Sequence, residues 1–110
     1  MDNRTANILR ALDVTALELL VALLERARSE KDLVEGVENV TQSNVHKKLQ
    51  RMERAGLVRA PAEGTRGKPW EVAAPRPTAA FIQSLFALSD ALDAADSESR
   101  ANLSSRLRNR

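Results

Sequence analysis

The chain has 110 residues, of which 43% are hydrophobic and 29% are charged, with four glycines and four prolines. This length and balance predict one small folded domain, with at most an element or two that a partner must cover, and they exclude a large multidomain enzyme. The absence of cysteine excludes disulfides, thiolate metal sites and cysteine nucleophiles. Because no long apolar run and no signal-peptide pattern occur, we expect a cytoplasmic protein without a membrane partner.

The formal net charge of +2 is unevenly distributed. Residues 1–40 hold five basic and eight acidic side chains, residues 41–70 hold seven and two, and residues 71–110 hold five of each. The positive charge is therefore concentrated in the middle third. This asymmetry favours an anionic partner, above all nucleic acid, and the alternative is a solvated basic face without a partner.

Two helices are predicted in the first quarter of the chain. The first covers about residues 5–12, and its apolar side consists of Ile8, Leu9 and Leu12. The second begins at about Ala16, since Thr15 and Glu18 have the spacing of a capping box and Val14 precedes them as part of a hydrophobic staple. Its leucines cover most of its circumference, so we expect this helix at the centre of the core.

Two further capping residues predict a short helix and a longer basic one. Ser29 opens a helix of about two turns, and Thr41 caps a helix over residues 42–55. Between them, Asn39 is the residue expected to take a positive φ. The longer helix is predicted to end at Gly56 in a Schellman motif, and its apolar stripe consists of Val45, Leu49 and Met52.

A small β-hairpin is predicted after this helix, with strands near residues 57–59 and 70–72. The loop over 61–69 contains two glycines, two prolines and two basic residues, which makes it too polar to bury. Trp70 alternates with Val72 toward the core, so packing in the core is favoured over stacking on a base.

A long helix is predicted from about Thr78 to Ala95, and residues 96–110 form either a short terminal helix or a frayed tail. Its large apolar residues spread over more than a third of its circumference, more than a small domain can cover. We therefore expect a homodimer seam, with one larger intramolecular core as the alternative. The resulting division is a domain over 1–76, a dimerisation helix over 77–95 and a terminal segment over 96–110.

The order of the elements, α-α-α-α-β-β-α, predicts a mainly α fold with a small β-hairpin, the winged helix-turn-helix. Opposite its core stripe, the helix over 42–55 presents an arc without an acidic residue, made of Ser43, His46, Lys47, Gln50, Arg51 and Arg54. Arginine and lysine can bind phosphates or guanine, glutamine can bind an adenine edge, and Ser43 lies near the free N–H groups of the helix start. The alternative for this arc is an ordinary solvated face.

Residues 41–58, with their Thr-Gln-Ser-Asn-Val start and Ala-Gly-Leu-Val ending, and the basic segment 64–69 together resemble the recognition helix and wing of the ArsR and MarR families of bacterial transcriptional regulators. The resemblance covers about residues 15–74. It implies a sequence-specific regulator of double-stranded DNA, a repressor that acts as a homodimer, with the helix over 42–55 in the major groove and the wing over 61–69 on flanking backbone or minor groove.

This chain departs from those families in two ways. The turn before the recognition helix lacks the usual glycine and is one residue longer. The cysteine pair or the histidines of the metal-sensing ArsR branch are absent, so no metal or other cofactor is expected.

Two sets of site residues follow. The predicted DNA-binding residues are Thr41, Gln42, Ser43, Asn44, His46, Lys47, Gln50, Arg51, Arg54, Arg66 and Lys68. The predicted dimer-interface residues are Ile8, Leu9, Leu12, Phe81, Ile82, Leu85, Leu88 and Leu92.

The competing functional class is a winged-helix module that binds proteins and not DNA. An enzyme is not expected, because the single histidine has no nucleophile or acid–base partner in the sequence. The sequence does not identify an operator or a small-molecule effector.

Overall fold

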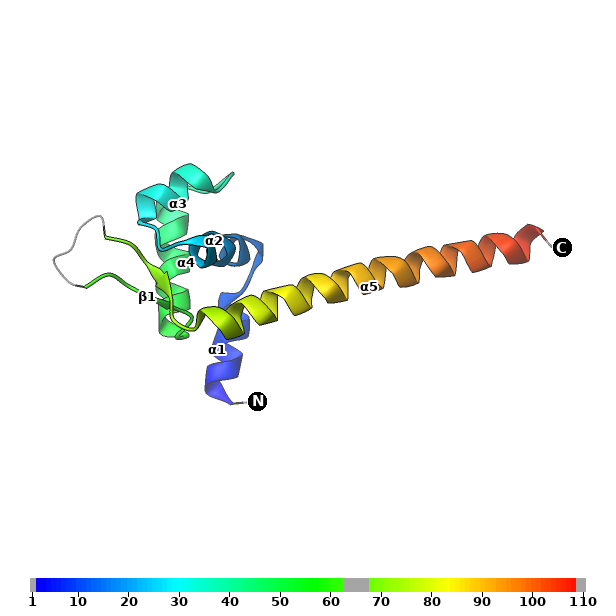
Figure 1. Ribbon diagram of the computed structural model, residues 1–110, viewed down its shortest axis with the longest axis horizontal. Coiled ribbons are helices and arrows are strands. Elements are labelled where there is room, and N and C mark those ends of the chain that lie inside the picture. The colour runs from blue at the N-terminus through cyan, green and yellow to red at the C-terminus, as the bar shows by residue number, and fades with distance from the viewer. Residues whose placement is uncertain (1, 63–67, 109–110) are drawn as a thin grey trace. The chain divides into compact units, whose positions relative to one another are not determined.

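The computed structural model describes residues 2–62 and 68–108, with side chains up to Ser99 (Figure 1). The elements occur in the predicted order, and their bounds are α1 Asn3–Ala11, α2 Val14–Glu25, α3 Glu30–Gly36, α4 Gln42–Arg54, β1 Val58–Arg59, β2 Glu71–Val72 and α5 Pro75–Arg108. The chain divides into two compact units, Met1–Ala79 and Ala80–Arg110. The first unit contains the elements of a winged helix-turn-helix.

The starts of α1 and α2 are set by two aspartates. Asp2 accepts a hydrogen bond from the Thr5 N–H at 2.7 Å, so α1 begins at Asn3, before the predicted start. Asp13 accepts from the Ala16 N–H at 2.8 Å, so α2 begins at Val14. The predicted Thr15 cap and the staple at Val14 were wrong: aspartate is a stronger N-cap than threonine, and Val14 is 73% exposed.

The core of the first unit is built around α2, as predicted. This helix packs against α3, α4 and β2. Side chains from every one of these elements are buried: Ala16, Leu19, Leu20, Leu23, Leu33, Val45, Leu49, Met52 and Val72. A helix that is apolar over most of its circumference has its lowest free energy where neighbours cover several sides.

Both ends of α4 follow the predicted local rules. Thr41 Oγ1 accepts from the Asn44 N–H at 3.2 Å. At the other end Gly56 has φ 82°, and the Gly56 and Leu57 N–H groups donate to the carbonyls of Glu53 and Met52, both at 2.9 Å. This is the predicted Schellman ending. The positive φ predicted for Asn39 is also confirmed, at 61°.

The two strands pair antiparallel, with Val58 opposite Val72 and Arg59 opposite Glu71. Trp70 is 7% exposed, so the core interpretation of this residue is confirmed. Its backbone also forms a bridge with Arg28, with N···O distances of 2.7 and 3.1 Å. The hairpin is thereby connected to the segment between α2 and α3.

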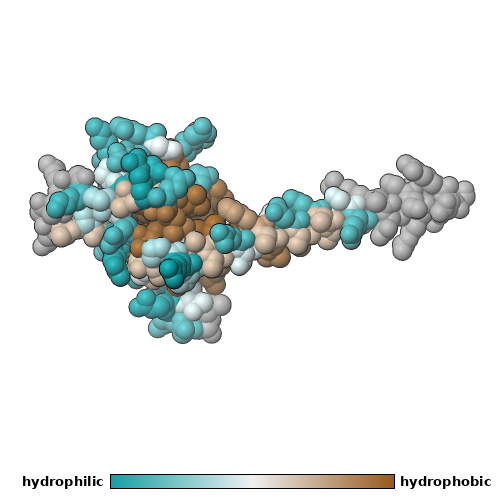
Figure 2. All heavy atoms as spheres, in the orientation of Figure 1, coloured by the Kyte–Doolittle hydropathy of each residue, from teal (hydrophilic) through white to brown (hydrophobic). Residues whose placement is uncertain are grey.

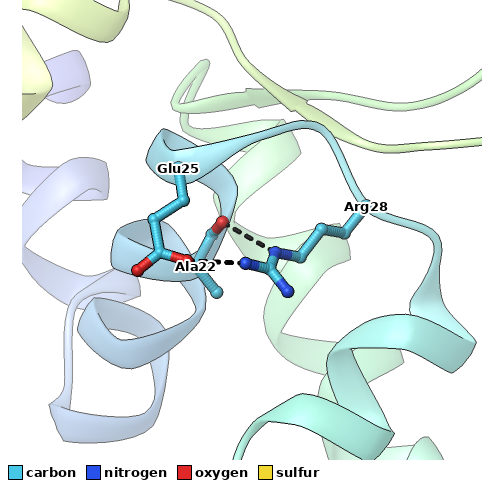
Figure 3. Close-up of polar contacts among 3 residues, drawn as sticks. All are labelled: Ala22, Glu25 and Arg28. Atoms are coloured by element: carbon cyan, nitrogen blue, oxygen red, sulfur yellow. Dashed lines mark hydrogen bonds and ion pairs between the residues drawn. The ribbon is translucent and has the colours of Figure 1, made fainter.

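The side chain of Arg28 closes the end of α2 (Figure 3). Its Nε donates to the Ala22 carbonyl at 2.9 Å, and its Nη2 lies 2.7 Å from Glu25 Oε2. The Ala22 carbonyl is one of the last four of the helix, which have no partner inside it. Arg28 therefore satisfies an acceptor that the helix leaves open.

The last helix begins at Pro75 and continues to Arg108. The predicted start near Thr78 was three residues too late, because prolines are compatible with a first turn whose N–H groups have no intrahelical partner. The Thr78 N–H then donates to the Ala74 carbonyl at 3.1 Å. The predicted end near Ala95 and the separate short terminal helix are not observed, because α5 continues without a break through residues 96–108. No helix in the described residues is both long and apolar enough to cross a membrane.

Candidate nucleic-acid interface

The exposed side of α4 is the centre of the candidate interface. Val45, Leu49 and Met52 are all 0% exposed and fix the helix against the core. Opposite this stripe the helix is open to solvent and carries Ser43, His46, Lys47, Gln50, Arg51 and Arg54, while the exposed Glu53 lies outside this set. The division of the helix predicted from the sequence is thus the one observed. The six side chains together form what we call the basic arc.

The residues at the start of α4 differ in their freedom to bind a ligand. The Thr41 hydroxyl is engaged as the N-cap, and Asn44 is half-buried. Gln42 and Ser43 are exposed in the first turn, where backbone N–H groups and the helix dipole favour an anion. Gln42 and Ser43 can therefore bind a phosphate, whereas the Thr41 hydroxyl already caps the helix.

His46 has a partner that the sequence did not reveal. Its Nδ1 lies 2.8 Å from Oε1 of Glu30, the first residue of α3. The side chain of His46 remains 50% exposed, so Nε2 can still face a ligand. No group of three potential metal ligands occurs in the described part of the chain.

Lys48 lies outside the basic arc and has a structural role. Its Nζ forms an ion pair with the Asp13 carboxylate, and its side chain is only 16% exposed. The hydrogen bond from Lys48, followed by that from the Ala16 N–H, holds the pKa of Asp13 below its usual range despite partial burial. The α2 cap is thereby connected to α4, which positions the arc relative to the core.

Of the wing, the structure describes the two strands at its base and Lys68. Arg59 Nη1 lies 3.8 Å from Glu71 Oε1 across the two strands, so part of the charge of Arg59 is compensated. Lys68 is exposed. The predicted contact at Arg66 lies outside the described residues.

Several predicted dimer residues are exposed in the single chain. Leu9 is 53% exposed, and Ile8 and Leu12 are half-buried. In the second unit Phe81, Leu88 and Leu92 are 46%, 55% and 57% exposed, and Leu85 is half-buried. Ile82 differs, because at 4% exposure its side chain is already covered.

A further apolar area lies on the first unit. Figure 2 shows hydrophobic side chains gathered on one face of this unit, where Figure 1 draws α2, within a border of hydrophilic ones. Val14 and Val21 of α2 are among the exposed large hydrophobic residues. An exposed apolar area with a polar border is typical of a protein–protein contact.

Neither a protein-family model nor a curated protein matches the chain. Solved structures do match. The crystal structure of M. tuberculosis Rv0081 is 26% identical, with a TM-score of 0.61 over 88% of this chain and 92% of that one. An ArsR-like transcriptional regulator from Rhodococcus sp. RHA1 is also 26% identical, with a TM-score of 0.58 over 84% and 88%.

A third structure has the higher TM-score of 0.68 at 21% identity, over 83% of each chain. It is the homodimeric winged helix-turn-helix DNA-binding domain of Mb0332 from Mycobacterium bovis, described as a possible ArsR-family transcriptional regulator. The neighbours whose function is stated are regulators and not enzymes, in agreement with the expectation from the sequence. The chain therefore has the winged helix-turn-helix fold of ArsR-like transcriptional regulators.

Proposed function

We propose that the protein is a sequence-specific, double-stranded DNA-binding transcriptional regulator. The observation that carries this proposal is the basic arc on α4, which is exposed, contains no acidic side chain and belongs to the helix that reads DNA in winged helix-turn-helix proteins. The major groove of B-DNA is wide enough for one α-helix. A protein-interaction module has no need for seven basic residues against two acidic ones over residues 41–70.

Within the arc the side chains divide by chemistry. Lys47, Arg51 and Arg54 carry the charge that phosphates attract, and guanidinium groups can also bind guanine. Gln50 is uncharged and can bind the edge of an adenine. Lys68 and Arg66 of the wing extend the contact to flanking backbone or minor groove. Charged residues thus supply affinity, and Gln50 supplies preference for a sequence.

We further propose that the protein acts as a homodimer. The exposed Phe81, Leu88 and Leu92 support this, as does the M. bovis neighbour, which is homodimeric. Two copies would present two recognition helices to a pseudo-palindromic site. On the resemblance to ArsR-type proteins we assign the regulator the role of a repressor, located with the DNA in the cytoplasm.

The test of DNA binding is a double variant, Lys47→Ala with Arg51→Ala. Fluorescence anisotropy with a genomic and a random duplex at several salt concentrations should show much weaker binding, with unchanged helix content by circular dichroism. Arg26→Ala with Arg76→Ala is the matched control, because it removes the same charge from exposed positions outside the arc. Equal affinities of the two double variants would refute the assignment of the arc.

Salt dependence and sequence preference separate the two kinds of contact. If a dimer neutralises about six to eight phosphates, log affinity falls against log salt with a slope of about −5 to −7. Lys68→Ala should weaken binding to both duplexes by the same factor. Gln50→Ala should leave the slope unchanged and lower the preference for the true site by about 1–3 kcal/mol.

A further inference from the structure

A groove between α1 and α4 has no acidic residue among the described residues that line it. Its walls consist of side chains from both helices, and its floor contains Ala55 at the end of α4. The polar lining residues are Arg4, Asn7, Arg10, Arg51 and Arg54. The two helices pack against each other, so the groove belongs to the rigid part of the first unit. Four arginine side chains therefore line one short stretch of surface.

The positive charge of this groove has no ion-pair partner among the described residues. None of the four arginines forms an ion pair within the described residues, and Arg10 makes one long hydrogen bond, 3.4 Å, to Asn7 Oδ1. The charges of Arg4 and Arg51 also act on two capping carboxylates. The pKa of Asp2 is lowered first by its hydrogen bonds from Thr5 and to a smaller degree by the charge of Arg4. The pKa of Asp13 is lowered first by its hydrogen bond from Lys48 and to a smaller degree by the charge of Arg51. Both carboxylates already accept backbone hydrogen bonds.

A purely structural role explains part of this arrangement. The Arg4 guanidinium lies beside Gly56, where an added Cβ would be 2.7 Å from Nη1, and so it faces the negative end of the α4 dipole. Arg51, Arg54 and Arg10 also lie in last turns of their helices. A dipole stabilises each cation by at most about 1 kcal/mol at an exposed site, and like charges gathered in one groove repel each other. An anion between them removes that repulsion.

We propose that this groove binds a backbone phosphate of the DNA duplex, and that α1 thereby takes part in DNA binding through Arg4 and Arg10. The inference rests on the proposed function, because Arg51 and Arg54 belong both to the basic arc and to the groove. The surface that faces DNA on α4 is therefore continuous with α1. Guanidinium groups bind phosphate in bidentate fashion, and they are more weakly hydrated than an ammonium group.

The lining favours a phosphate of the duplex over a small organic effector. Sites for organic ligands are concave and lined mainly by hydrophobic and aromatic side chains. Among the described residues that line the groove, Ala55 is the only apolar one, and the others are all exposed to solvent. An open groove lined by four arginines suits a charged group that is held in place by a larger molecule.

The experiment measures the salt dependence of duplex binding for full-length Arg4→Gln, Arg10→Gln and the double variant. Each lost phosphate contact should make the slope of log affinity against log salt shallower by about 0.9, or about 1.8 for a dimer with one contact in each subunit. Affinities for specific and random duplexes should fall by equal factors, since a phosphate carries no sequence information. Arg26→Gln is the control, with the same charge change at an exposed position outside the groove.

The outcomes separate the two proposals. If the parent binds duplex with a steep slope and Arg10→Gln has the slope of Arg26→Gln, the groove is not a DNA contact and the proposed function stands. If the parent shows no salt-dependent duplex binding, the proposed function fails and this inference with it. Arg4→Gln can also loosen the end of α4, so thermal melting is measured for each variant, and Arg10→Gln decides because Arg10 does not adjoin Gly56.

A titration with inorganic phosphate, followed by NMR, tests whether the groove binds free phosphate instead of a phosphate of the duplex. Saturable phosphate binding that Arg10→Gln abolishes, together with an unchanged slope on DNA, would make the groove a free-anion site and overturn the inference. Loss of both phosphate binding and slope supports it.

Discussion

Helices α4 and α5 both carry an apolar stripe that the sequence reveals, and the two stripes have different fates. On α4, Val45, Leu49 and Met52 are completely buried. On α5, Phe81, Leu88 and Leu92 are 46–57% exposed. The same periodic pattern thus marks a core in one helix and an open surface in the other. The pattern predicts that a helix face will be buried. Whether the same chain or a partner buries it depends on the rest of the fold.

Burial of the two stripes therefore stabilises the protein at different stages, on folding for α4 and on association with a partner for α5. Burying a leucine contributes roughly 1.5–3 kcal/mol. For α4 this contribution stabilises the first unit as soon as it folds. For the exposed residues of α5 it becomes available only when a partner covers them, so it depends on protein concentration.

The largest expected effect contrasts the two stripes directly. Leu49→Ala should lower the free energy of unfolding by about 2–5 kcal/mol, because the truncated side chain is fully buried. Leu92→Ala should change it by far less at low protein concentration. Urea denaturation followed by circular dichroism measures both, and equal losses would show that the α5 stripe is already part of a core.

Introducing a charge on α5 tests the proposed seam. Leu88→Glu should convert a dimer of about twice the chain mass to a monomer at micromolar concentration, because a carboxylate cannot be buried there without a partner. Multi-angle light scattering gives the mass. Gln83→Glu adds the same charge at an exposed polar position of the same helix and should remain dimeric. If the parent and Leu88→Glu have the same mass, the seam lies elsewhere.

The end of α4 supplies a smaller, local effect. Gly56→Ala should destabilise the fold by about 1–2 kcal/mol, since a residue with a Cβ is strained at φ 82° and that Cβ would meet the Arg4 guanidinium. Gly36→Ala is the control, because its nearest neighbour is an arginine nitrogen at 3.8 Å, an ordinary contact. The melting temperature of Gly56→Ala should be well below that of Gly36→Ala, and the reverse order would contradict the strain at Gly56.

The smallest effect concerns the Asp13–Lys48 ion pair. Asp13→Asn keeps an N-cap but removes the charge, and we expect a loss of about 0.2–1 kcal/mol at pH 7. Because the pKa of Asp13 is lowered in the folded state, its contribution is present above the unfolded value and disappears as pH falls through the folded one. Parent and variant should therefore converge in stability in acid, and a gap that stays constant down to pH 2 would rule out the ion pair as its origin.

Local features of the fold could be predicted because their determinants are adjacent in the sequence. Ser29 and Thr41 bind N–H groups three residues later. Gly56 and Asn39 take left-handed backbone conformations that depend on their own residue type, since glycine has no Cβ and asparagine tolerates this region. The buried side of α4 follows from helical spacing alone, and with it the membership of the basic arc.

Contacts between distant residues were decided by the tertiary structure. Asp13, the stronger of the two capping residues near the start of α2, also binds Lys48, 35 positions away, and this second contact could not be read from local spacing. The Glu30–His46 pair, the Arg28–Trp70 bridge and the groove between α1 and α4 likewise join segments whose proximity no spacing rule encodes. The sequence by itself therefore determined the order of the elements, both ends of α4 and the apolar sides of the helices. Only the packing of those helices decided which charges meet, because Coulomb and hydrogen-bond energies depend on distance in space and not on distance along the chain.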